Sequence, residues 1–538
     1  MLVNHRWDSF WKCTTGRVDR IWNLGLLLVA LGLFTTNLGG VALRDWDEGT
    51  VAQVAREISR TPFGWDWLYP TVHGVPYLNK PLLVHWVIAL LYRAVGVSEW
   101  TARLPGALLT AISVPILYGV GRELFSRRTP AVLAALVYLT LLPVVRHGRL
   151  AMLDGAVLCF WLLCLLCLLR TRRDLRWGLG TGVAFGLLWL TKGLIALPLG
   201  AIALLFLWLD TPRLLRSVYL WVGLLLGMVP VAAWYGAQWW RYQQAFIQIT
   251  LFNQSLDRVW VPIEANSGAP WYYLLEILKY SLPWLLFLPW GVRLAWQNRN
   301  LSWSKLVLVW AGGYLLIISL MSTKLPWYVL PFYPAMALIV GAYLATLWDG
   351  TDVLGGWRQQ RRRIPLLIST GLTFIAMVVW VVAFYFSPLA SHPQAELSTI
   401  FGAAAFTITV AAFLAACHDC QFIPILIWGS YITLLLFVAN GPWVWELNES
   451  YPVKPVAQMV KQHTPPGTPV VTTYPYSRPS LNFYSDRSVI PYTPKLIQQH
   501  WQQNTQAYLL TNKTTLGTLK LEPSRQLAQS GNWILVSK

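Results

Sequence analysis

A small set of charged residues stands out in a chain that is otherwise strongly apolar. Asp47 and Asp154 each lie at the edge of an apolar run, where a carboxylate is costly unless it is paired or used. Lys80, Lys192 and Lys324 also lie at the ends of apolar runs. A carboxylate can take the proton of an attacking hydroxyl, and cations can hold a phosphate while negative charge grows on the leaving oxygen. These residue types suit transfer of a group from a lipid phosphate to a hydroxyl.

Each of these residues also has a structural explanation. Asp47 can be the N-cap or first-turn acid of an amphipathic helix that begins beside it. Asp154 can pair with Arg149 or Arg146. A lysine at the end of a membrane span can extend its amine to the interface. Three such lysines beside two acids are harder to explain in this way than any single one.

The composition predicts a membrane protein. Of the 538 residues, 56% are hydrophobic and 12% are charged, which is too apolar for an ordinary soluble domain. The formal net charge of +19 does not indicate nucleic-acid binding, because the basic residues lie between apolar runs rather than on one soluble face. We expect membrane lipids as surroundings and no nucleic acid as partner.

Apolar runs predict an all-α polytopic bundle of about thirteen transmembrane helices, since a span needs about 20 apolar residues to cross roughly 30 Å of hydrocarbon. The runs lie near residues 21–43, 102–121, 130–146, 153–170, 177–192, 194–209, 218–239, 271–295, 305–322, 325–348, 364–387, 397–417 and 421–440. The run at 81–97 has only 17 residues and contains His85. We expect it to be a re-entrant or interfacial helix, because counting it as a span would place basic loops on opposite sides of the membrane.

Basic residues in short loops set the orientation. With thirteen spans, every basic segment faces the cytoplasm; these segments are the N-terminus, 122–128, 170–176, 213–216, 293–305 and 358–363. The N-terminal basic residues precede a retained first span rather than a cleaved signal peptide. The sequence therefore predicts an integral protein of the plasma or inner membrane with a cytoplasmic N-terminus and an extracytoplasmic C-terminus.

A change in composition near residue 441 predicts a second domain. Residues 441–538 are polar and Pro-rich, with a helix-like stretch from Pro452 and strand-like stretches at 470–474, 507–510 and 533–536. This pattern indicates a small extracytoplasmic α/β domain. It follows a transmembrane domain of residues 1–440, whose first outer loop, 44–101, holds interfacial helices.

The cysteines predict neither a disulfide framework nor a defined metal site. All six lie in apolar runs or in loops assigned to the cytoplasm. Cys417-His418-Asp419-Cys420 has the spacing of half a zinc site, but no second ligand pair lies near it in the sequence. A turn between helices is the simpler interpretation, and we expect no certain cofactor. A divalent metal stays open but is not supported by ligand residues.

Several motifs resemble those of a family of membrane glycosyltransferases, the protein O-mannosyltransferase and lipid A aminoarabinose transferase type (glycosyltransferase family 39-like). The resembling segments are Asp45-Trp46-Asp47-Glu48-Gly49, Tyr77-Leu78-Asn79-Lys80-Pro81, Arg149-Leu150-Ala151-Met152-Leu153-Asp154, Thr191-Lys192-Gly193 and Lys324-Leu325-Pro326-Trp327-Tyr328-Val329-Leu330-Pro331. Their order and spacing across roughly residues 20–350 are more specific than any one motif.

The resemblance implies a GT-C fold and an inverting glycosyltransferase. The donor would be a polyprenyl-phosphate-linked sugar, and the acceptor a hydroxyl or phosphate on a lipid, glycan or protein at the non-cytoplasmic face. It implies that Asp47 and Asp154 are the catalytic acids. The implied substrate-binding residues are Glu48, Lys80, Lys192, Arg149, Arg258 and Lys324.

The sequence departs from the aminoarabinose transferases at three positions. Asn79 stands where they usually have Glu, Thr50 where they have Arg, and Asn253 where their outer loop has His. A metal site built from that Glu and His is therefore not predicted, and lipid A is not predicted as the acceptor.

Two other functions remain open from the sequence. A transporter or flippase of lipid-linked sugars would carry charged or Gly/Pro-broken segments deep in the bundle, and the central parts of these runs contain few ionisable residues. A non-catalytic scaffold that presents the C-terminal domain would tolerate neutralisation of Asp47, Asp154, Lys80 and Lys192.

Overall fold

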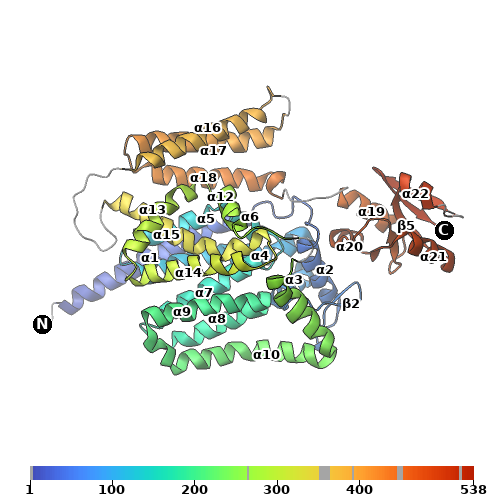
Figure 1. The fold of residues 1–538 in the computed structure, drawn as a ribbon, viewed down its shortest axis with the longest axis horizontal. Helices are drawn as coiled ribbons and strands as arrows, with labels where there is room; N and C mark the ends of the chain where they lie inside the picture. Colours follow the sequence, from blue (N-terminus) through green and yellow to red (C-terminus); the bar gives the residue numbers. More distant parts are fainter. Residues whose placement is uncertain are drawn as a thin grey trace. The chain divides into compact units, whose positions relative to one another are not determined.

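The computed structural model describes residues 4–262, 266–350, 364–390, 393–444, 452–519, 521 and 524–538. The chain is mostly helical (Figure 1) and divides into two compact units. The first, the bundle unit, comprises Met1–Leu38, Leu78–Val84 and Leu104–Trp443. The second, the outer unit, comprises Gly39–Tyr77, His85–Arg103 and Val444–Lys538.

The bundle unit consists of long apolar helices. Among the described residues, nine helical stretches are long and apolar enough to cross a membrane, so the chain is an integral membrane protein. They are Gly16–Thr35 in α1 (Asn4–Thr35), α4 (Glu99–Leu124), Trp177–Asp210, Val218–Trp260, α14 (Ser302–Leu320), Pro326–Asp349, α16 (Leu366–Tyr385), α17 (Ala395–Ala416) and α18 (Phe422–Ala439). A bent pair, α5 (Thr129–Leu139) and α6 (Leu142–Arg149), makes a tenth if it counts as one span.

The predicted count of about thirteen is not confirmed, because several predicted runs are short or broken helices. α7 (Asp154–Arg170) has 17 residues. The run predicted at 271–295 is divided into α12 (Tyr272–Tyr280), a 3-10 turn at Trp284–Phe287 and α13 (Leu288–Gln297). Pro283 lies in that break, where a residue without an N–H cannot continue the helical hydrogen bonds.

The stretch Trp177–Asp210 turns back on itself. α8 (Trp177–Lys192) ends at Gly193, whose φ of 65° is in the left-handed region that favours glycine, and α9 (Ala196–Asp210) follows. Arg172, just before α8, forms an ion pair with Asp210 at the end of α9, with a nitrogen–oxygen distance of 2.7 Å. The start of α8 and the end of α9 therefore lie together, as the two spans predicted at 177–192 and 194–209 require.

Glycines set the packing of α8 against α10 (Val218–Phe246). A Cβ atom on Gly182 would lie 1.9 Å from the carbonyl carbon of Gly223, and one on Gly186 would lie 2.1 Å from the oxygen of Gly227. Small residues at this spacing allow the backbones of membrane helices to approach closely. This packing fixes the axis of α8 and thus the position of Lys192 at its end.

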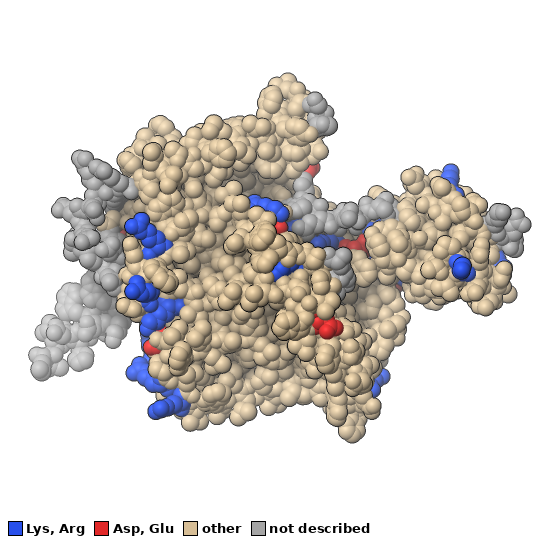
Figure 2. All heavy atoms as spheres, in the orientation of Figure 1, with Lys and Arg blue, Asp and Glu red and all other residues tan. Residues whose placement is uncertain are grey.

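Acidic residues connect the basic loops at one end of the bundle unit. The ion pairs are Asp19 with Arg122 and Arg128, Glu123 with Arg170 and Arg173, Asp210 with Arg172 and Lys305, and Asp349 with Arg127. Figure 2 shows Lys and Arg side chains gathered along this end, at the left of the view. The predicted basic loop at 358–363 lies outside the described residues.

The outer unit joins the first outer loop to the C-terminal domain. The loop contains α2 (Asp47–Arg60), the hairpin of β1 (Thr71–Val72) and β2 (Val75–Pro76), and α3 (Leu83–Val95). The 13 residues of α3 extend about 20 Å, which is shorter than the hydrocarbon layer. By its contacts the loop, except for Leu78–Val84, groups with Val444–Lys538, whereas the sequence assigned the whole loop to the transmembrane domain.

The C-terminal domain is a five-stranded mixed sheet with helices. The strand order is β4-β3-β5-β7-β6, with β4 (Val489–Pro491) and β5 (Tyr508–Asn512) parallel to β3 (Val470–Thr472). β7 (Trp533–Ser537) is antiparallel to β5 and to β6 (Arg525–Ser530). One apolar core includes residues of α19 (Val453–His463) and α20 (Pro479–Ser485), and another includes residues of α21 (Pro494–Gln503). The predicted α/β class is confirmed, and the sequence missed β4 and β6.

Candidate functional site

Asp154 and Lys192 meet at the end of the bundle unit opposite the basic loops. Asp154 begins α7, whose other end is Arg170, and Lys192 ends α8, which begins beside Arg176. The Lys192 amine donates to the Asp154 carboxylate at 2.6 Å, and both side chains are nearly buried. A charge-assisted hydrogen bond of this length is strong, and a carboxylate at a helix N-terminus is further stabilised by the helix dipole.

Two more cations act on this pair. Lys80 lies in the segment Leu78–Val84 of the bundle unit, where the Thr250 hydroxyl donates to the Leu78 carbonyl. The pKa of Lys80 is lowered to about 7, mainly by burial. The positive charges of Arg258 and Lys192 also lower this pKa, and the negative charge of Asp154 raises it by less. Lys80, Lys192, Arg258 and Asp154 thus form one electrostatic group, called here the cation cluster.

Tyr328 connects two members of the cation cluster. Its hydroxyl accepts a hydrogen bond of 2.9 Å from the Arg258 guanidinium, and its ring lies 5.9 Å from the Lys192 amine, close enough for a cation–π interaction. Gln254 accepts a second bond from Arg258 at 3.0 Å. The Tyr314 hydroxyl donates to the Tyr328 carbonyl at 2.9 Å, which fixes the segment. We predicted no role for Tyr328 from the sequence, although it lies inside the motif that begins at Lys324.

The cation cluster has three positive groups and one carboxylate. Such an excess of positive charge in a partly desolvated place favours an anion with several acceptor oxygens, and a phosphate ester fits this requirement. Lys80 and Lys192 offer rotatable ammonium donors, and Arg258 offers a planar fork of donors. The arrangement can hold a phosphate while negative charge develops on its bridging oxygen.

Two of the predicted substrate-binding residues, Arg149 and Lys324, donate to backbone carbonyls at the ends of helices. Arg149 is buried and donates to the carbonyls of Leu33, Phe34 and Thr36 at the end of α1. Lys324 is buried and donates to the carbonyls of Ile318 and Ser319, the last turn of α14, at 3.1 and 2.7 Å. Cations at helix C-termini satisfy otherwise unpaired carbonyls. Both contacts favour a scaffold role, and substrate binding by these two residues stays a prediction.

Asp47 lies in the outer unit, at the first position of α2. The preceding residue, Trp46, has φ 60° and ψ −63°, and the Asp47 N–H donates to the Asp45 carbonyl at 2.7 Å. This is a γ-turn with positive φ, a strained form for a residue with a side chain. The Asp47 carboxylate is partly exposed and lies 3.6 Å from the Arg44 guanidinium. The turn places this carboxylate at the N-terminus of α2, in a conformation that the neighbouring contacts must maintain.

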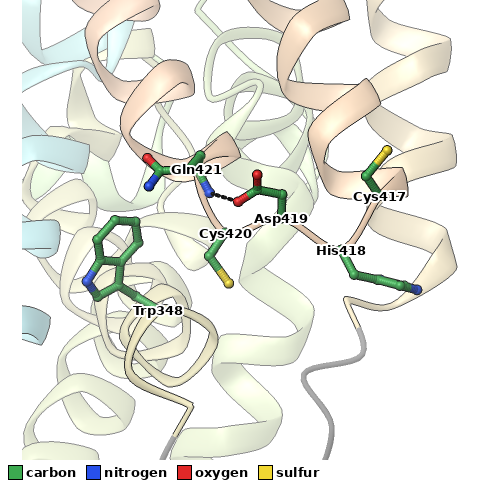
Figure 3. Close-up of a pocket in the computed structure, with 6 residues that line it drawn as sticks. All are labelled: Trp348, Cys417, His418, Asp419, Cys420 and Gln421. Carbon is green, nitrogen blue, oxygen red and sulfur yellow. Dashed lines mark hydrogen bonds between the residues drawn. The ribbon is translucent and has the colours of Figure 1, made fainter.

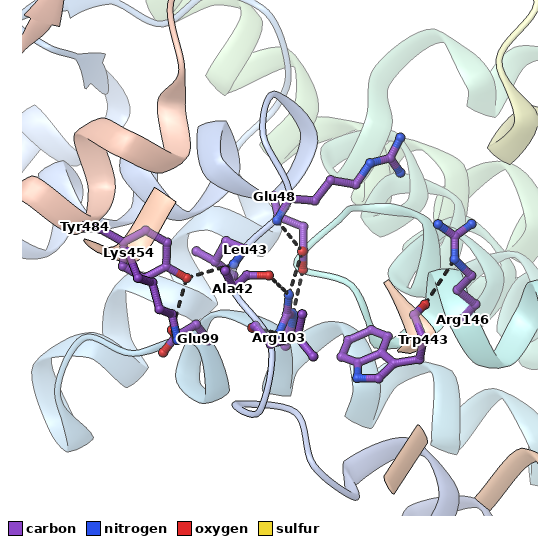
Figure 4. Close-up of polar contacts among 11 residues, drawn as sticks. Ala42, Leu43, Glu48, Glu99, Arg103, Arg146, Trp443, Lys454 and Tyr484 are labelled. Atoms are coloured by element: carbon purple, nitrogen blue, oxygen red, sulfur yellow. Dashed lines mark hydrogen bonds and ion pairs between the residues drawn. The ribbon is translucent and has the colours of Figure 1, made fainter. Parts of the chain in front are cut away.

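Glu48 forms a buried ion pair. Both side chains are fully buried, and the Arg103 guanidinium donates to the two Glu48 oxygens at 2.8 Å each (Figure 4). Arg103 also donates to the carbonyls of Val41 and Ala42, and Glu48 accepts from the Arg44 N–H. These contacts account for the carboxylate within the fold, so substrate binding by Glu48 stays a prediction. The sequence did not single out Arg103.

The adjacent Asp45 is bound by the C-terminal domain. Arg478 donates to Asp45 Oδ2 at 2.6 Å, and the N–H and hydroxyl of Ser480 donate to Oδ1. No sequence signal pointed to these residues, because 433 positions separate Asp45 from Arg478. The structure therefore collects Asp154, Lys192, Lys80 and Arg258 in the bundle unit and places Asp47 and Glu48 in the outer unit.

Metal ligands do not assemble in the part of the chain that the structure describes. No group of three or more His, Cys, Asp and Glu side chains there is placed to hold an ion. Cys417, His418, Asp419 and Cys420 line a cavity of about 580 Å³ together with Trp348. Figure 3 shows the thiols of Cys417 and Cys420 and the His418 ring directed away from one another. This geometry supports the simpler interpretation of the motif as a turn between α17 and α18.

Comparison with known proteins agrees with the motifs. Residues 79–236 match the family described as dolichyl-phosphate-mannose-protein mannosyltransferase. The chain is 31% identical over 344 residues to undecaprenyl phosphate-alpha-4-amino-4-deoxy-L-arabinose arabinosyl transferase 1 of Pseudomonas fluorescens, a match that covers 60% of each protein. It is 29% identical over 340 residues to the corresponding transferase of Pectobacterium carotovorum, covering 60% of this chain and 58% of the relative. These matches span about three fifths of the relatives' length.

A solved structure shares the fold over nearly the whole chain. ArnT from Cupriavidus metallidurans bound to undecaprenyl phosphate matches with a TM-score of 0.76 at 19% identity, covering 97% of this chain and 98% of that one. The predicted GT-C fold, with its helical bundle and small C-terminal α/β domain, is thereby confirmed. The chain therefore has the GT-C fold and is similar to membrane proteins of the protein O-mannosyltransferase and lipid A aminoarabinose transferase type.

Proposed function

We propose that the chain is a polyprenyl-phosphate-sugar-dependent glycosyltransferase that acts on the non-cytoplasmic side of the plasma or inner membrane. The donor is a sugar linked to undecaprenyl phosphate or a similar polyprenyl phosphate. The acceptor is a hydroxyl or phosphate group on a lipid, glycan or protein. The names of the relatives, which contain undecaprenyl phosphate and arabinosyl transferase, support this class of donor and reaction.

The observation that carries the proposal is the cation cluster. Lys80, Lys192 and Arg258 with a single acid, Asp154, offer net positive charge where a lipid phosphate at the membrane surface would lie. The cluster is at the opposite end of α7 and α8 from the ion-paired basic loops. Because basic loops face the cytoplasm, we expect the cluster on the outer face and the N-terminus inside, and we propose an extracytoplasmic C-terminal domain.

In the proposed reaction, the acceptor oxygen attacks the anomeric carbon of the donor sugar as Asp47 takes the acceptor proton. The bond between that carbon and the phosphate oxygen breaks, and the phosphate leaves with its lipid. Lys80, Lys192 and Arg258 stabilise the charge that develops on this oxygen. Asp154 holds the Lys192 amine in place. A single displacement inverts the anomeric configuration.

A lipid-linked sugar transporter is not favoured. A transport path needs ionisable or broken segments within the bundle. α7, α8 and α9 carry no Asp, Glu, Lys, Arg or His between their terminal residues. The ionisable groups of these helices lie at their ends, as a reaction at the membrane surface requires.

The acceptor can be identified in a strain that lacks the protein. Mass spectrometry of its glycans and glycolipids should show loss of one sugar, which the unaltered chain and Asp66→Asn restore. Asp66 is an exposed acid in the same outer loop and serves as the matched control. Asp47→Asn should fail to restore the sugar. Full restoration by Asp47→Asn would rule out Asp47 as the catalytic base, and an unchanged glycan profile in the deletion strain would argue against the enzyme.

A further inference from the structure

The turn that carries Asp47 is held from the C-terminal domain. Asp45, two residues before Asp47, accepts hydrogen bonds from the Arg478 guanidinium and from the N–H and hydroxyl of Ser480. The Arg478 side chain is almost fully buried and that of Asp45 is largely buried. Both Asp45 carboxylate oxygens are thus engaged by one short segment of the C-terminal domain, just before and within α20.

Residues of the same C-terminal segment contact the turn in two further places. The ring of Trp46, at the strained position, packs against the Tyr476 ring with centroids 6.4 Å apart. Gly49 allows α20 to approach, because a Cβ atom there would lie 2.7 Å from the Ser480 nitrogen. Residues of the C-terminal domain therefore contact the turn on which the strained backbone of Trp46 lies.

We propose that Arg478 and Ser480 are positioning residues for the transfer reaction, and that the C-terminal domain holds Asp47 in its reactive orientation through Asp45. The chain of contacts is direct. Arg478 and Ser480 fix the Asp45 side chain, and the Asp45 carbonyl accepts the Asp47 N–H at 2.7 Å. A turn with positive φ at a tryptophan relaxes when the contacts around it are removed. Loss of Arg478 should thus move the Asp47 carboxylate without changing its chemistry.

The outer unit has other contacts that keep it assembled when Arg478 is replaced. Asp486 pairs with Arg56 at 3.2 Å and with Arg60 at 2.8 Å. Asn482 lies 2.8 Å from the His73 ring nitrogen. Tyr484 donates to Glu99, which also pairs with Lys454 (Figure 4). A variant at Arg478 is therefore expected to keep the domain attached and folded.

This inference rests on the proposed role of Asp47, and the experiment separates the two. Arg478→Gln, Arg478→Lys and Ser480→Ala are prepared in the full chain, with Asp47→Asn as the reference for loss of the acid. Arg525→Gln, on an exposed residue of β6, is the silent control. Arg487→Gln is the structural control, because Arg487 is buried and donates within the domain to the Thr464 and Lys461 carbonyls.

The readouts are kcat, the KM for donor, and the thermal unfolding midpoint. Arg478→Gln should lower kcat about 10- to 100-fold, the range expected when a reacting group is misplaced by about an ångström, with a donor KM near that of Arg525→Gln and an unfolding midpoint lowered no more than in Arg487→Gln. Arg478→Lys should recover part of kcat, and Ser480→Ala should lower kcat less than Arg478→Gln.

Two results would overturn the inference. One is an unchanged kcat in Arg478→Gln while Asp47→Asn is inactive, which leaves the proposed function intact. The other is a loss of kcat that simply follows a lowered unfolding midpoint, as expected for Arg487→Gln. Full activity of Asp47→Asn would instead refute the proposed function, whatever Arg478→Gln does.

Discussion

The two units use charged residues in different ways. In the cation cluster of the bundle unit, Lys80, Lys192 and Arg258 share one carboxylate, Asp154. In the outer unit, acids are matched by cations within the fold, as in the pairs Asp45–Arg478, Glu48–Arg103, Glu99–Lys454 and Asp486 with Arg56 and Arg60. Acids and cations that pair with one another stabilise a fold, whereas an excess of cations over acids leaves positive charge that can bind an anionic ligand. The contrast suggests donor binding in one unit and a scaffold for Asp47 in the other.

Breaking the Asp154–Lys192 pair tests whether the cation cluster of the bundle unit binds the lipid phosphate. This change should have the largest effect on stability and on lipid binding. Lys192→Met leaves a nearly buried carboxylate without its cation, which typically costs about 3–5 kcal/mol. The unfolding midpoint in detergent should fall, and binding of undecaprenyl phosphate, measured by native mass spectrometry, should be lost. Lys495→Met, on an exposed lysine of α21, should change neither. Unaltered lipid binding by Lys192→Met would mean that the cluster is not the phosphate site.

Breaking the Glu48–Arg103 pair should lower stability by a comparable amount. Unlike the loss of Lys192, it should leave binding of undecaprenyl phosphate unchanged. Glu48→Ala leaves a buried guanidinium without its carboxylate, at a typical cost of about 3–5 kcal/mol. Limited proteolysis should show earlier cleavage in the outer unit than in the unaltered chain or in Asp66→Ala. The protein that remains folded should bind undecaprenyl phosphate normally. Weakened lipid binding with unchanged stability would restore Glu48 as a substrate ligand and would contradict the comparison.

The pKa of Lys80 predicts a pH dependence for donor binding. With a pKa lowered to about 7 by burial and by Arg258 and Lys192, the free amine is charged below pH 7 and loses its proton above it. Phosphate binds the charged form, so affinity should be highest below pH 7 and should fall by up to about tenfold per pH unit above it. Binding should also take up a proton above pH 7.

Lys80→Arg separates this effect from titration of the lipid phosphate itself. Arginine stays charged throughout this range, so the ratio of the two affinities should depend on pH only through Lys80. Affinity is measured from pH 6 to pH 9 for both chains. A constant ratio across this range would show that Lys80 does not titrate there or does not bind the phosphate.

The smallest effect is expected at Asp486. Although burial alone raises it, the pKa of Asp486 is lowered overall by the hydrogen bond from Arg60 and the charges of Arg56 and Arg60. A lowered pKa means that this group contributes stability above its ordinary pKa of 3.8 and that the contribution is lost as pH falls below that value. Asp486→Asn should reduce stability by about 1 kcal/mol or less at pH 7. In acid unfolding, the difference between the two chains should shrink as pH falls below 3.8 and should disappear once Asp486 is protonated in the folded chain.

The sequence predicted the fold where each helix or strand carries its own signal. The apolar runs located the membrane helices, and alternation located β3, β5 and β7. The number of spans was less predictable, because breaks such as that at Pro283 divide an apolar run without changing its composition. β4, with three residues, is too short for its alternation to be recognised.

The candidate site was predictable only in part. Charge at the end of an apolar run marked Asp154 and Lys192, whose pairing the structure shows at 2.6 Å. The same signal marked Lys324, whose amine donates to backbone carbonyls at the end of a helix and whose role in substrate binding stays a prediction. Composition does not distinguish a cation that binds a ligand from one that binds a backbone carbonyl. The role of Arg478 could not be predicted, because nothing in its local sequence indicates that it binds Asp45, 433 residues away.

Transfer from a defined donor tests the central claim most directly. The unaltered chain and Asp47→Asn are reconstituted in vesicles with a glycosylated undecaprenyl phosphate and with membrane extract from the deletion strain as acceptor. Release of free undecaprenyl phosphate is followed by mass spectrometry together with the newly glycosylated product. We expect both products at equal rates with the unaltered chain and a loss of at least about 100-fold with Asp47→Asn. Equal release by the two chains, or movement of the intact donor across the vesicle membrane without release, would contradict the account.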